Sequence, residues 1–154
     1  MIEITSDNRN RTVAELRNLL TKNHGNMAEA GAVSWQFHKK GLLTIEKRTV
    51  DEDTLLSLAL DAGAEDVKVG EKSYEVITDP HHFEAVKKAL ADAKIDTVLA
   101  EVTSVPQNTI RLEEKAAEQM LKLREVLDEH DDVQKVHANF DISDEVLEKG
   151  AAAG

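Results

Sequence analysis

The sequence predicts an α+β protein of two small α/β sandwich domains, one discontinuous and one inserted into it. Short runs in which apolar and polar residues alternate indicate strands, and longer runs with apolar residues at helical spacing indicate helices. In residues 42–108 these runs follow the order β-α-β-β-α-β, which is typical of a ferredoxin-like fold. The segment before that stretch and the segment after it each contain too few secondary-structure elements to form a domain alone. This favours a single domain that the two segments form together.

The composition favours a soluble protein with a mainly aliphatic core. Of the 154 residues, 41% are hydrophobic, 3% aromatic and 32% charged. No apolar run approaches the roughly 18 residues of a membrane span, and the strand-like start at Met1 is unlike a signal peptide. The absence of cysteine excludes disulfides, thiol catalysis and cysteine-bound zinc. We therefore expect a cytoplasmic protein without a membrane partner.

Negative charge dominates the chain but is spread unevenly. The net charge is −11, yet residues 1–48 contain eight Lys or Arg and only five Asp or Glu. Residues 49–154 contain eleven basic and twenty-five acidic residues. Because an acidic protein can still bind phosphate groups through one basic face, this asymmetry is compatible with a nucleic-acid-binding surface near the N-terminus.

The first elements are expected to be a short strand and a capped helix. Residues 2–5 alternate as a strand. Thr12 and Glu15 match the Ser/Thr-x-x-Glu capping box, so we expect the helix to run from Val13 to Asn23. Gly25 is expected to follow the helix as its C′ residue.

A second strand is expected soon after this helix. Val33, Trp35 and Phe37 alternate with polar residues, which predicts a strand with one buried face. The run Lys39-Lys40-Gly41 is expected to close that strand as a basic turn. Strand, helix and strand together predict a β-α-β unit, whose two strands could be parallel.

The later elements complete the two domains. The patterns predict a strand at 42–47, a helix at 52–62, strands around Val67 and Tyr74, a helix opened by Asp79 and Pro80, a strand around Val98 to Val102, a long helix at 112–129, a strand at 133–137 and a short helix capped by Ser143. We assign residues 1–41 with 109–149 to the discontinuous domain, 42–108 to the inserted domain, and 150–154 to a frayed tail.

The strongest candidate for chemistry is the polar stretch before the first predicted helix. Arg9 and Arg11 are expected in the loop that enters this helix, where guanidiniums and free amides suit a phosphate group. Parallel strands would bring the ends of both predicted strands to one sheet edge and gather these arginines with the later lysines. The candidate nucleic-acid-binding residues are Asn8, Arg9, Asn10, Arg11, Lys39 and Lys40. The alternative is that these arginines are ordinary solvated side chains.

Two aromatic residues offer a second route to nucleic acid. Trp35 and Phe37 could stack on bases, as aromatic residues do on RNA-binding sheets. Their alternation with polar neighbours favours the alternative, in which both belong to the core.

No motif supports catalysis. The sequence lacks a Gly-x-Gly-x-x-Gly loop, a phosphate-binding loop, a Gly-x-Ser-x-Gly elbow and a His-Glu-x-x-His helix. His81 and His82 are adjacent and therefore point in different directions, and the acidic clusters lie at expected helix ends, where solvated charge is common. We expect a protein that is not an enzyme and needs no metal or cofactor.

Several segments in order resemble the YebC family, whose mitochondrial members are translational activators of cytochrome oxidase. The similar segments are Asp7 to Glu15, Gly31 to Phe37 with Lys40-Gly41, Asp61 to Val67, Glu101 to Thr103 with Pro106 to Thr109, and Asp131 to Val136 with Asn139. The resemblance implies a three-domain protein with a basic helical N-terminal domain, a discontinuous second domain and a ferredoxin-like third domain inserted in it. The sequence resembles domains two and three without the first.

The resemblance also implies a non-enzymatic regulator of gene expression that acts on nucleic acid or the ribosome. Family members are described either as ribosome-associated factors that help translation through difficult sequences, such as proline runs, or as DNA-binding transcriptional regulators. We favour the translation factor, because an acidic inserted domain is poorly suited to lie along duplex DNA. Two alternatives stay open: an acidic module that docks a basic protein partner, and a small-molecule sensor suggested by fold analogy alone.

Overall fold

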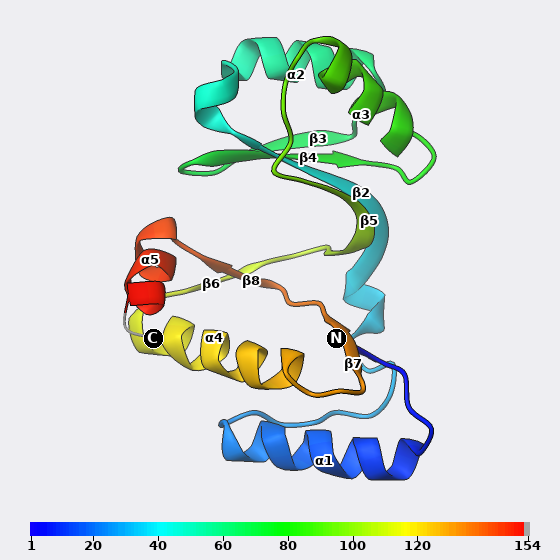
Figure 1. Ribbon diagram of the computed structural model, residues 1–154, viewed down its shortest axis with the longest axis vertical. Helices are drawn as coiled ribbons and strands as arrows, with labels where there is room; N and C mark the ends of the chain where they lie inside the picture. Colours follow the sequence, from blue (N-terminus) through cyan, green and yellow to red (C-terminus); the bar gives the residue numbers. More distant parts are fainter. Residues whose placement is uncertain (153–154) are drawn as a thin grey trace. The chain divides into compact units, whose positions relative to one another are not determined.

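The computed structural model describes residues 1–152 and the side chains of residues 1–149, and it divides the chain into two compact units (Figure 1). The first unit comprises Met1–Phe37 and Pro106–Gly154, and the second comprises His38–Val105. In chain order the elements are β1 (Ile2–Ile4), α1 (Arg9–Lys22), the 3₁₀ turn η1 (Ser34–Gln36), β2 (Phe37–Glu46), the 3₁₀ turn η2 (Lys47–Thr49), α2 (Glu52–Asp61), β3 (Asp66–Val69), β4 (Ser73–Thr78), α3 (Phe83–Asp92), β5 (Leu99–Pro106), β6 (Ile110–Leu112), α4 (Glu114–Asp128), β7 (Val133–Val136), β8 (Phe140–Ile142) and α5 (Asp144–Ala152).

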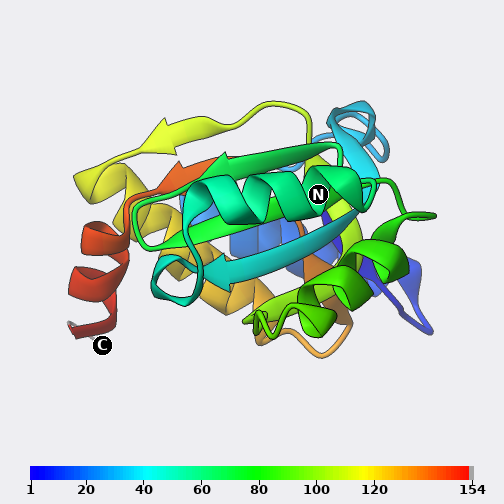
Figure 2. The same cartoon turned by 90° about the horizontal axis from the view of Figure 1, so that it is seen from above.

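The second unit is a four-stranded sheet with two helices on one face. Its strands lie in the order β3-β4-β2-β5, and β4 pairs antiparallel with both β2 and β3. Figure 2, seen from above, shows α2 and α3 on the near side of this sheet. The core between the layers is aliphatic, and its fully buried residues are Leu43, Ile45, Leu55, Ala59, Val76, Val86 and Leu90. The predicted α+β class and the β-α-β-β-α-β order are confirmed.

Gly41 lies inside a strand rather than in the predicted basic turn. Strand β2 continues through Lys39, Lys40 and Gly41 without interruption. A Cβ atom at Gly41 would lie 2.2 Å from the Thr78 hydroxyl oxygen and 2.7 Å from a ring carbon of Phe83. The glycine therefore permits a close approach of the backbone to its neighbours. A glycine within a strand pattern can thus indicate close packing as well as a turn.

The helix start predicted at Asp79 is also wrong by several residues. Helix α3 begins at Phe83, with His82 at the N-cap position. Asp79 instead organises the preceding turn: its carboxylate accepts from the His81 amide at 2.8 Å, and its carbonyl accepts from the His82 amide at 3.0 Å. The Asp-Pro pair thus makes a turn that leads into the helix, as it often does.

The first unit joins residues from the two ends of the chain. Strand β1 pairs antiparallel with β7, with Ile2 opposite Val136, and β6 pairs parallel with β8. Helices α1 and α4 lie side by side (Figure 1). Their shared core consists of Leu16, Leu20, Leu123 and Leu127. The predicted parallel β-α-β unit is therefore wrong, because β1 finds its partner far along the chain and β2 belongs to the other sheet.

Helix α1 ends one residue earlier than predicted, in a Schellman motif. His24, not Gly25, has the left-handed conformation, with φ +64°. Its amide donates to the Thr21 carbonyl at 3.4 Å, and the Gly25 amide donates to the Leu20 carbonyl at 2.7 Å. These two bonds satisfy carbonyls that the end of a helix would otherwise leave free.

The predicted strand at Val33, Trp35 and Phe37 is wrong in the same region. Residues Ser34–Gln36 form the 3₁₀ turn η1, and the side chain of Trp35 is 65% exposed. A strand needs a neighbouring strand to pair with. The predicted β-α-β unit would have supplied β1 as that neighbour, but β1 is paired with β7 instead. Trp35 is consequently not a core residue, which overturns the favoured interpretation of its pattern.

The C-terminal part adds elements beyond those predicted. The short strands β6 and β8 were not expected, and α5 extends to Ala152 where a frayed tail was expected from residue 150. Residues 153–154 lie outside the described residues. Ser143 caps α5 as predicted, since its hydroxyl accepts from the Val146 amide at 3.3 Å. None of the helices within residues 1–152 combines the length and apolar character needed to cross a bilayer.

Candidate nucleic-acid interface

Helix α1 begins four residues before the predicted start, so the candidate arginines lie on the helix itself. Asn8 is the N-cap residue, and its side-chain oxygen accepts from the Arg11 amide at 3.1 Å. Arg9 is the first helical residue. The capping box predicted for Thr12 and Glu15 is not formed, because Asn8 is itself among the strongest N-cap residues and Thr12 bonds elsewhere.

Thr12 is fully buried and takes part in a series of hydrogen bonds that anchors α1. The Asn8 amide donates to the Ser6 hydroxyl at 3.0 Å, and the Ser6 and Thr12 hydroxyls are 2.6 Å apart. The Thr12 hydroxyl lies 2.6 Å from a carboxylate oxygen of Asp132. Because the carboxylate can only accept, Thr12 donates its single proton there and Ser6 donates to Thr12. This series of hydrogen bonds fixes the start of α1 to the loop before β7.

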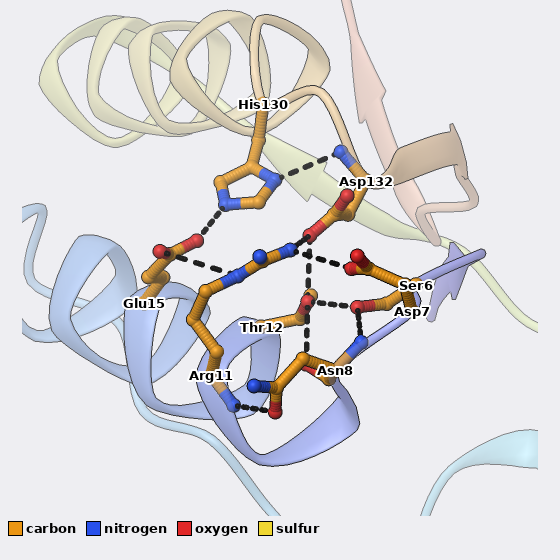
Figure 3. Close-up of polar contacts among 8 residues, drawn as sticks. All are labelled: Ser6, Asp7, Asn8, Arg11, Thr12, Glu15, His130 and Asp132. Carbon is orange, nitrogen blue, oxygen red and sulfur yellow. Dashed lines mark hydrogen bonds and ion pairs between the residues drawn. The ribbon is translucent and has the colours of Figure 1, made fainter.

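Arg11 is held by carboxylates and is not free to bind phosphate. Its guanidinium lies 3.0 Å from Asp132, 3.2 Å from Asp7 and 3.8 Å from Glu15, and Figure 3 shows it between these groups. The hydrogen bond to Asp132 raises the pKa of Arg11 still further above its ordinary value. The surface pocket here is lined mainly by acidic residues: Arg11, Glu15, Glu129, His130, Asp131 and Asp132. Such a lining repels an anionic ligand.

His130 completes this cluster and bears on whether it could hold a metal ion. Glu15, His130 and Asp132 bring potential ligand atoms within 4.8 Å of one another. However, the Asp132 amide donates to His130 Nδ1 at 3.1 Å, so the ring proton is on Nε2, which then donates to Glu15 at 2.7 Å. In this tautomer Nε2 has no lone pair for a metal. These hydrogen bonds tie α1 to the loop before β7.

Removing the Thr12 hydroxyl is expected to destabilise the fold. Thr12→Val keeps the shape of the buried side chain but withdraws a hydrogen bond from Asp132, which we expect to lower the free energy of unfolding by about 1–3 kcal/mol. Chemical denaturation measures this change. Thr21→Val is the matched control, because the Thr21 hydroxyl is exposed and bonds only to the Arg17 carbonyl one turn earlier. An equal loss in both variants would contradict the anchoring role.

The same network makes stability depend on acid pH. The hydrogen bond from Thr12, followed by that from Arg11, holds the pKa of Asp132 below its ordinary value. A lowered folded-state pKa means that the ionised carboxylate contributes stability above the unfolded pKa, about 4, and that this contribution is lost as the pH falls through and below that value. We expect the stability difference between the wild-type chain and Asp132→Asn to shrink toward pH 3 in urea denaturation.

The neighbouring variant Asp131→Asn is the control for this pH dependence. It removes a carboxylate from an exposed side chain adjacent in sequence. If both variants differed from the wild type by the same amount at every pH, the anchoring role of Asp132 would be refuted.

The six predicted site residues fall into two groups. Asn8 caps α1, Arg11 is ion-paired, and Lys40 is bound by both oxygens of Glu65 at 2.8 and 2.9 Å. The other three are exposed and make no ion pair or side-chain hydrogen bond within residues 1–149: Arg9, Asn10 and Lys39. Arg9 and Asn10 lie on α1 of the first unit, whereas Lys39 and Lys40 lie on β2 of the second unit. With the strands in different sheets, the sheet-edge argument for a shared patch no longer applies.

The exposed side of α1 carries further basic and amide side chains that the sequence-based hypothesis missed. Arg17, Asn18 and Lys22 are exposed, and within the described part of the chain their side chains have no ionic partner. We call Arg9, Asn10, Arg17, Asn18 and Lys22 the basic face of α1; Arg9 is included because it is exposed in the first turn, although helical spacing aligns it with Leu16 and Leu20. Helical spacing places Asn18 opposite the buried Leu16 and Leu20 and Arg17 on the flank of the helix, which was the available signal.

The charge of α1 sets it apart from the other helices. It contains four Lys or Arg and one Glu, whereas α2, α3, α4 and α5 are each neutral or acidic over the described residues. Arg9 also lies at the positive end of the helix dipole, in a first turn that has no acidic residue. Cations there are unfavourable unless an anion approaches, so α1 is suited to contact phosphate groups.

The chain matches a family model along nearly its whole length. The model of the second and third domains of TACO1/YebC proteins matches residues 1–140. A protein of Syntrophus aciditrophicus named "Probable transcriptional regulatory protein" is 50% identical over 152 residues, covering 99% of this chain and 61% of the relative. A protein of the same name from Geobacter sulfurreducens is 52% identical over 149 residues, covering 97% of this chain and 60% of the relative.

A solved structure is similar as well. The crystal structure of a conserved hypothetical protein from Aquifex aeolicus superposes with a TM-score of 0.75 at 39% sequence identity. The superposition covers 96% of this chain and 61% of the Aquifex aeolicus protein. The chain thus spans about 60% of the length of the curated relatives and of the solved structure that it matches.

Proposed function

Because the chain belongs to the TACO1/YebC family, we propose that it serves as part of a regulator of gene expression, whose contact with nucleic acid is the basic face of α1. The relatives are named probable transcriptional regulatory proteins, which supports the general role. The observation that carries the assignment to α1 is its unpaired positive charge on a chain whose net charge is −11.

The geometry supports contact with a phosphate backbone. Arg9 and Arg17 are eight residues apart, which is about 12 Å along a helix. That separation exceeds the 3.4 Å rise of one nucleotide in a duplex strand, so the two guanidiniums would contact different phosphates. Amide side chains such as Asn10 and Asn18 add donors that can bind phosphate or sugar oxygens. Such contacts position a protein on nucleic acid without reading its sequence.

For the finer role we propose a translation factor that binds RNA, with a DNA-binding transcriptional regulator as the second candidate. The names of the relatives favour transcription. RNA is favoured by the small number of free cations on the basic face and by the acidity of the rest of the chain. A duplex-binding protein commonly neutralises six to ten phosphates, and α1 offers Arg9, Arg17 and Lys22.

The experiment that tests the proposal compares nucleic acids by fluorescence anisotropy. Labelled single-stranded RNA, duplex RNA and duplex DNA are titrated with the full chain at salt concentrations between about 50 and 200 mM. We expect binding to RNA that weakens steeply as salt rises, since bound cations release counterions. Tighter binding to duplex DNA would support the transcriptional candidate. Binding to none of these ligands would overturn the proposal.

A further inference from the structure

The loop that follows α1 ends in the 3₁₀ turn η1, which projects an aromatic side chain into solvent. Every residue from 28 to 35 is exposed, and Trp35 is 65% exposed. Most of its neighbours in the loop are small, namely Ala28, Ala30, Gly31, Ala32 and Ser34, and the others are Glu29 and Val33, which is 47% exposed. Exposure of the largest side chain in the chain contrasts with the usual burial of tryptophan, so this residue calls for a reason.

This loop is held in place by hydrogen bonds within itself. The Ala32 amide donates to the Glu29 carbonyl at 3.1 Å, and the Ser34 hydroxyl donates to the Gly31 carbonyl at 2.9 Å. The Trp35 indole N–H donates to the Ala32 carbonyl at 3.1 Å. The ring is therefore fixed in orientation, and its only polar atom already has a partner. What it offers a ligand is the flat face of its π system.

We propose that Trp35 is a stacking platform for an unpaired base of a single-stranded nucleic acid. An aromatic face with a satisfied N–H suits a base, which stacks without needing a specific hydrogen bond. A protein partner with a large apolar pocket is a poorer match for Trp35 than a base is. Stable protein interfaces bury roughly 800 Å² on each partner, and the small residues around Trp35 contribute little of that area.

The position of Trp35 in the chain agrees with this proposal. Trp35 lies thirteen residues after Lys22, the last residue of α1, and both lie in the first unit. From Arg9 to Gln36 the chain contains four basic and two acidic residues, so this segment is basic within an acidic protein. Single-strand binding proteins commonly combine basic side chains for the backbone with aromatic faces for the bases. The proposal rests on the proposed function and specifies its ligand as single-stranded.

Trp35 is the only tryptophan in the chain, so its fluorescence reports on this site alone. We would titrate the full chain with a short oligouridylate and follow tryptophan emission, while anisotropy of a labelled copy measures binding independently. We expect emission to be quenched with the same dissociation constant that anisotropy gives. Trp35→Ala is expected to weaken binding by about 5- to 150-fold, and Trp35→Phe by less, because phenylalanine keeps a stacking face.

Two controls separate stacking from charge. An abasic oligonucleotide of the same length keeps the phosphates but has no bases, so Trp35→Ala should leave its affinity unchanged. Circular dichroism checks that the variants keep the fold, which is expected of an exposed position. If oligouridylate bound with salt dependence while emission and the affinity of Trp35→Ala stayed unchanged, the stacking proposal would fail and the proposed function would stand. Absence of oligouridylate binding in anisotropy would overturn the stacking proposal, while the proposed function would fall only if the duplex ligands did not bind either.

Discussion

Replacing Arg9 and Arg17 together by glutamine is expected to remove most of the salt-dependent binding to single-stranded RNA. Each lost phosphate contact should lower the slope of log affinity against log salt by about 0.7 on single strands, so the double variant should lose about 1.4. Glutamine has nearly the same helix propensity as arginine, and both side chains lack an ion pair among the residues described. The fold should therefore be kept, and fluorescence anisotropy at several salt concentrations measures the change.

A matched variant controls for the change in net charge. Lys68→Gln with Lys94→Gln removes two exposed positive charges from the second unit and leaves α1 intact. We expect this variant to keep the wild-type salt slope. If both double variants lost the same affinity, binding would reflect total charge, and α1 would not be a specific interface.

Substitution of Gly41 by alanine is expected to destabilise the second unit more than any surface change. The new Cβ would lie 2.2 Å from the Thr78 hydroxyl oxygen and 2.7 Å from Phe83, too close for real atoms, and the Thr78 side chain is fully buried. Overpacking of this kind costs about 1–3 kcal/mol, read as a shift of the urea midpoint at an unchanged slope.

A double-mutant cycle identifies the cause of this loss. Thr78→Ala removes the oxygen that the new Cβ meets, so it should cost less stability in the Gly41→Ala background than in the wild-type chain. Additive effects of the two substitutions would show that the collision with Thr78 is not the source. If the Gly41→Ala variant were as stable as the wild-type chain, that result would contradict the close packing of β2 against its neighbours.

Local signals were sufficient for most of the second unit. Strand β4 pairs with β2 and β3 within about forty residues along the chain, and only the pairing of β2 with β5 spans more. Asp51 caps α2 where the sequence places a helix start, by accepting from the Thr54 amide at 3.0 Å. Gly63 ends that helix with φ +109°. Besides the helix start at Asp79, Gly41 was misinterpreted, because a glycine that opens a turn and a glycine that permits close packing look the same in sequence.

The first unit could not be read locally because its contacts join distant residues. Asp132 accepts from Thr12 across 120 positions, and β1 pairs with β7. The hydroxyl that resembled a helix cap is used by this distant carboxylate, and the helix starts earlier, at Arg9. Without a partner strand, Trp35 could not be buried as its alternating pattern predicted.

Contacts between distant residues also explain why the sequence identified only part of the candidate site. The sequence drew attention to the basic start of the chain, and the structure places Arg9 and Asn10 exposed on α1. It could not reveal that Arg11 is paired with Asp132 or that Lys40 is paired with Glu65, because both carboxylates lie far away in sequence. Whether the exposed members bind nucleic acid stays a prediction.

A map of backbone amide shifts by NMR tests directly whether α1 and the loop that carries Trp35 bind single-stranded RNA. Single-stranded RNA is added to the isotopically labelled chain, and the amide signals that move are located on the structure. The account predicts that the shifts concentrate on Arg9–Lys22 and on the loop that carries Trp35. Shifts confined to residues of the second unit, with α1 unchanged, would contradict it.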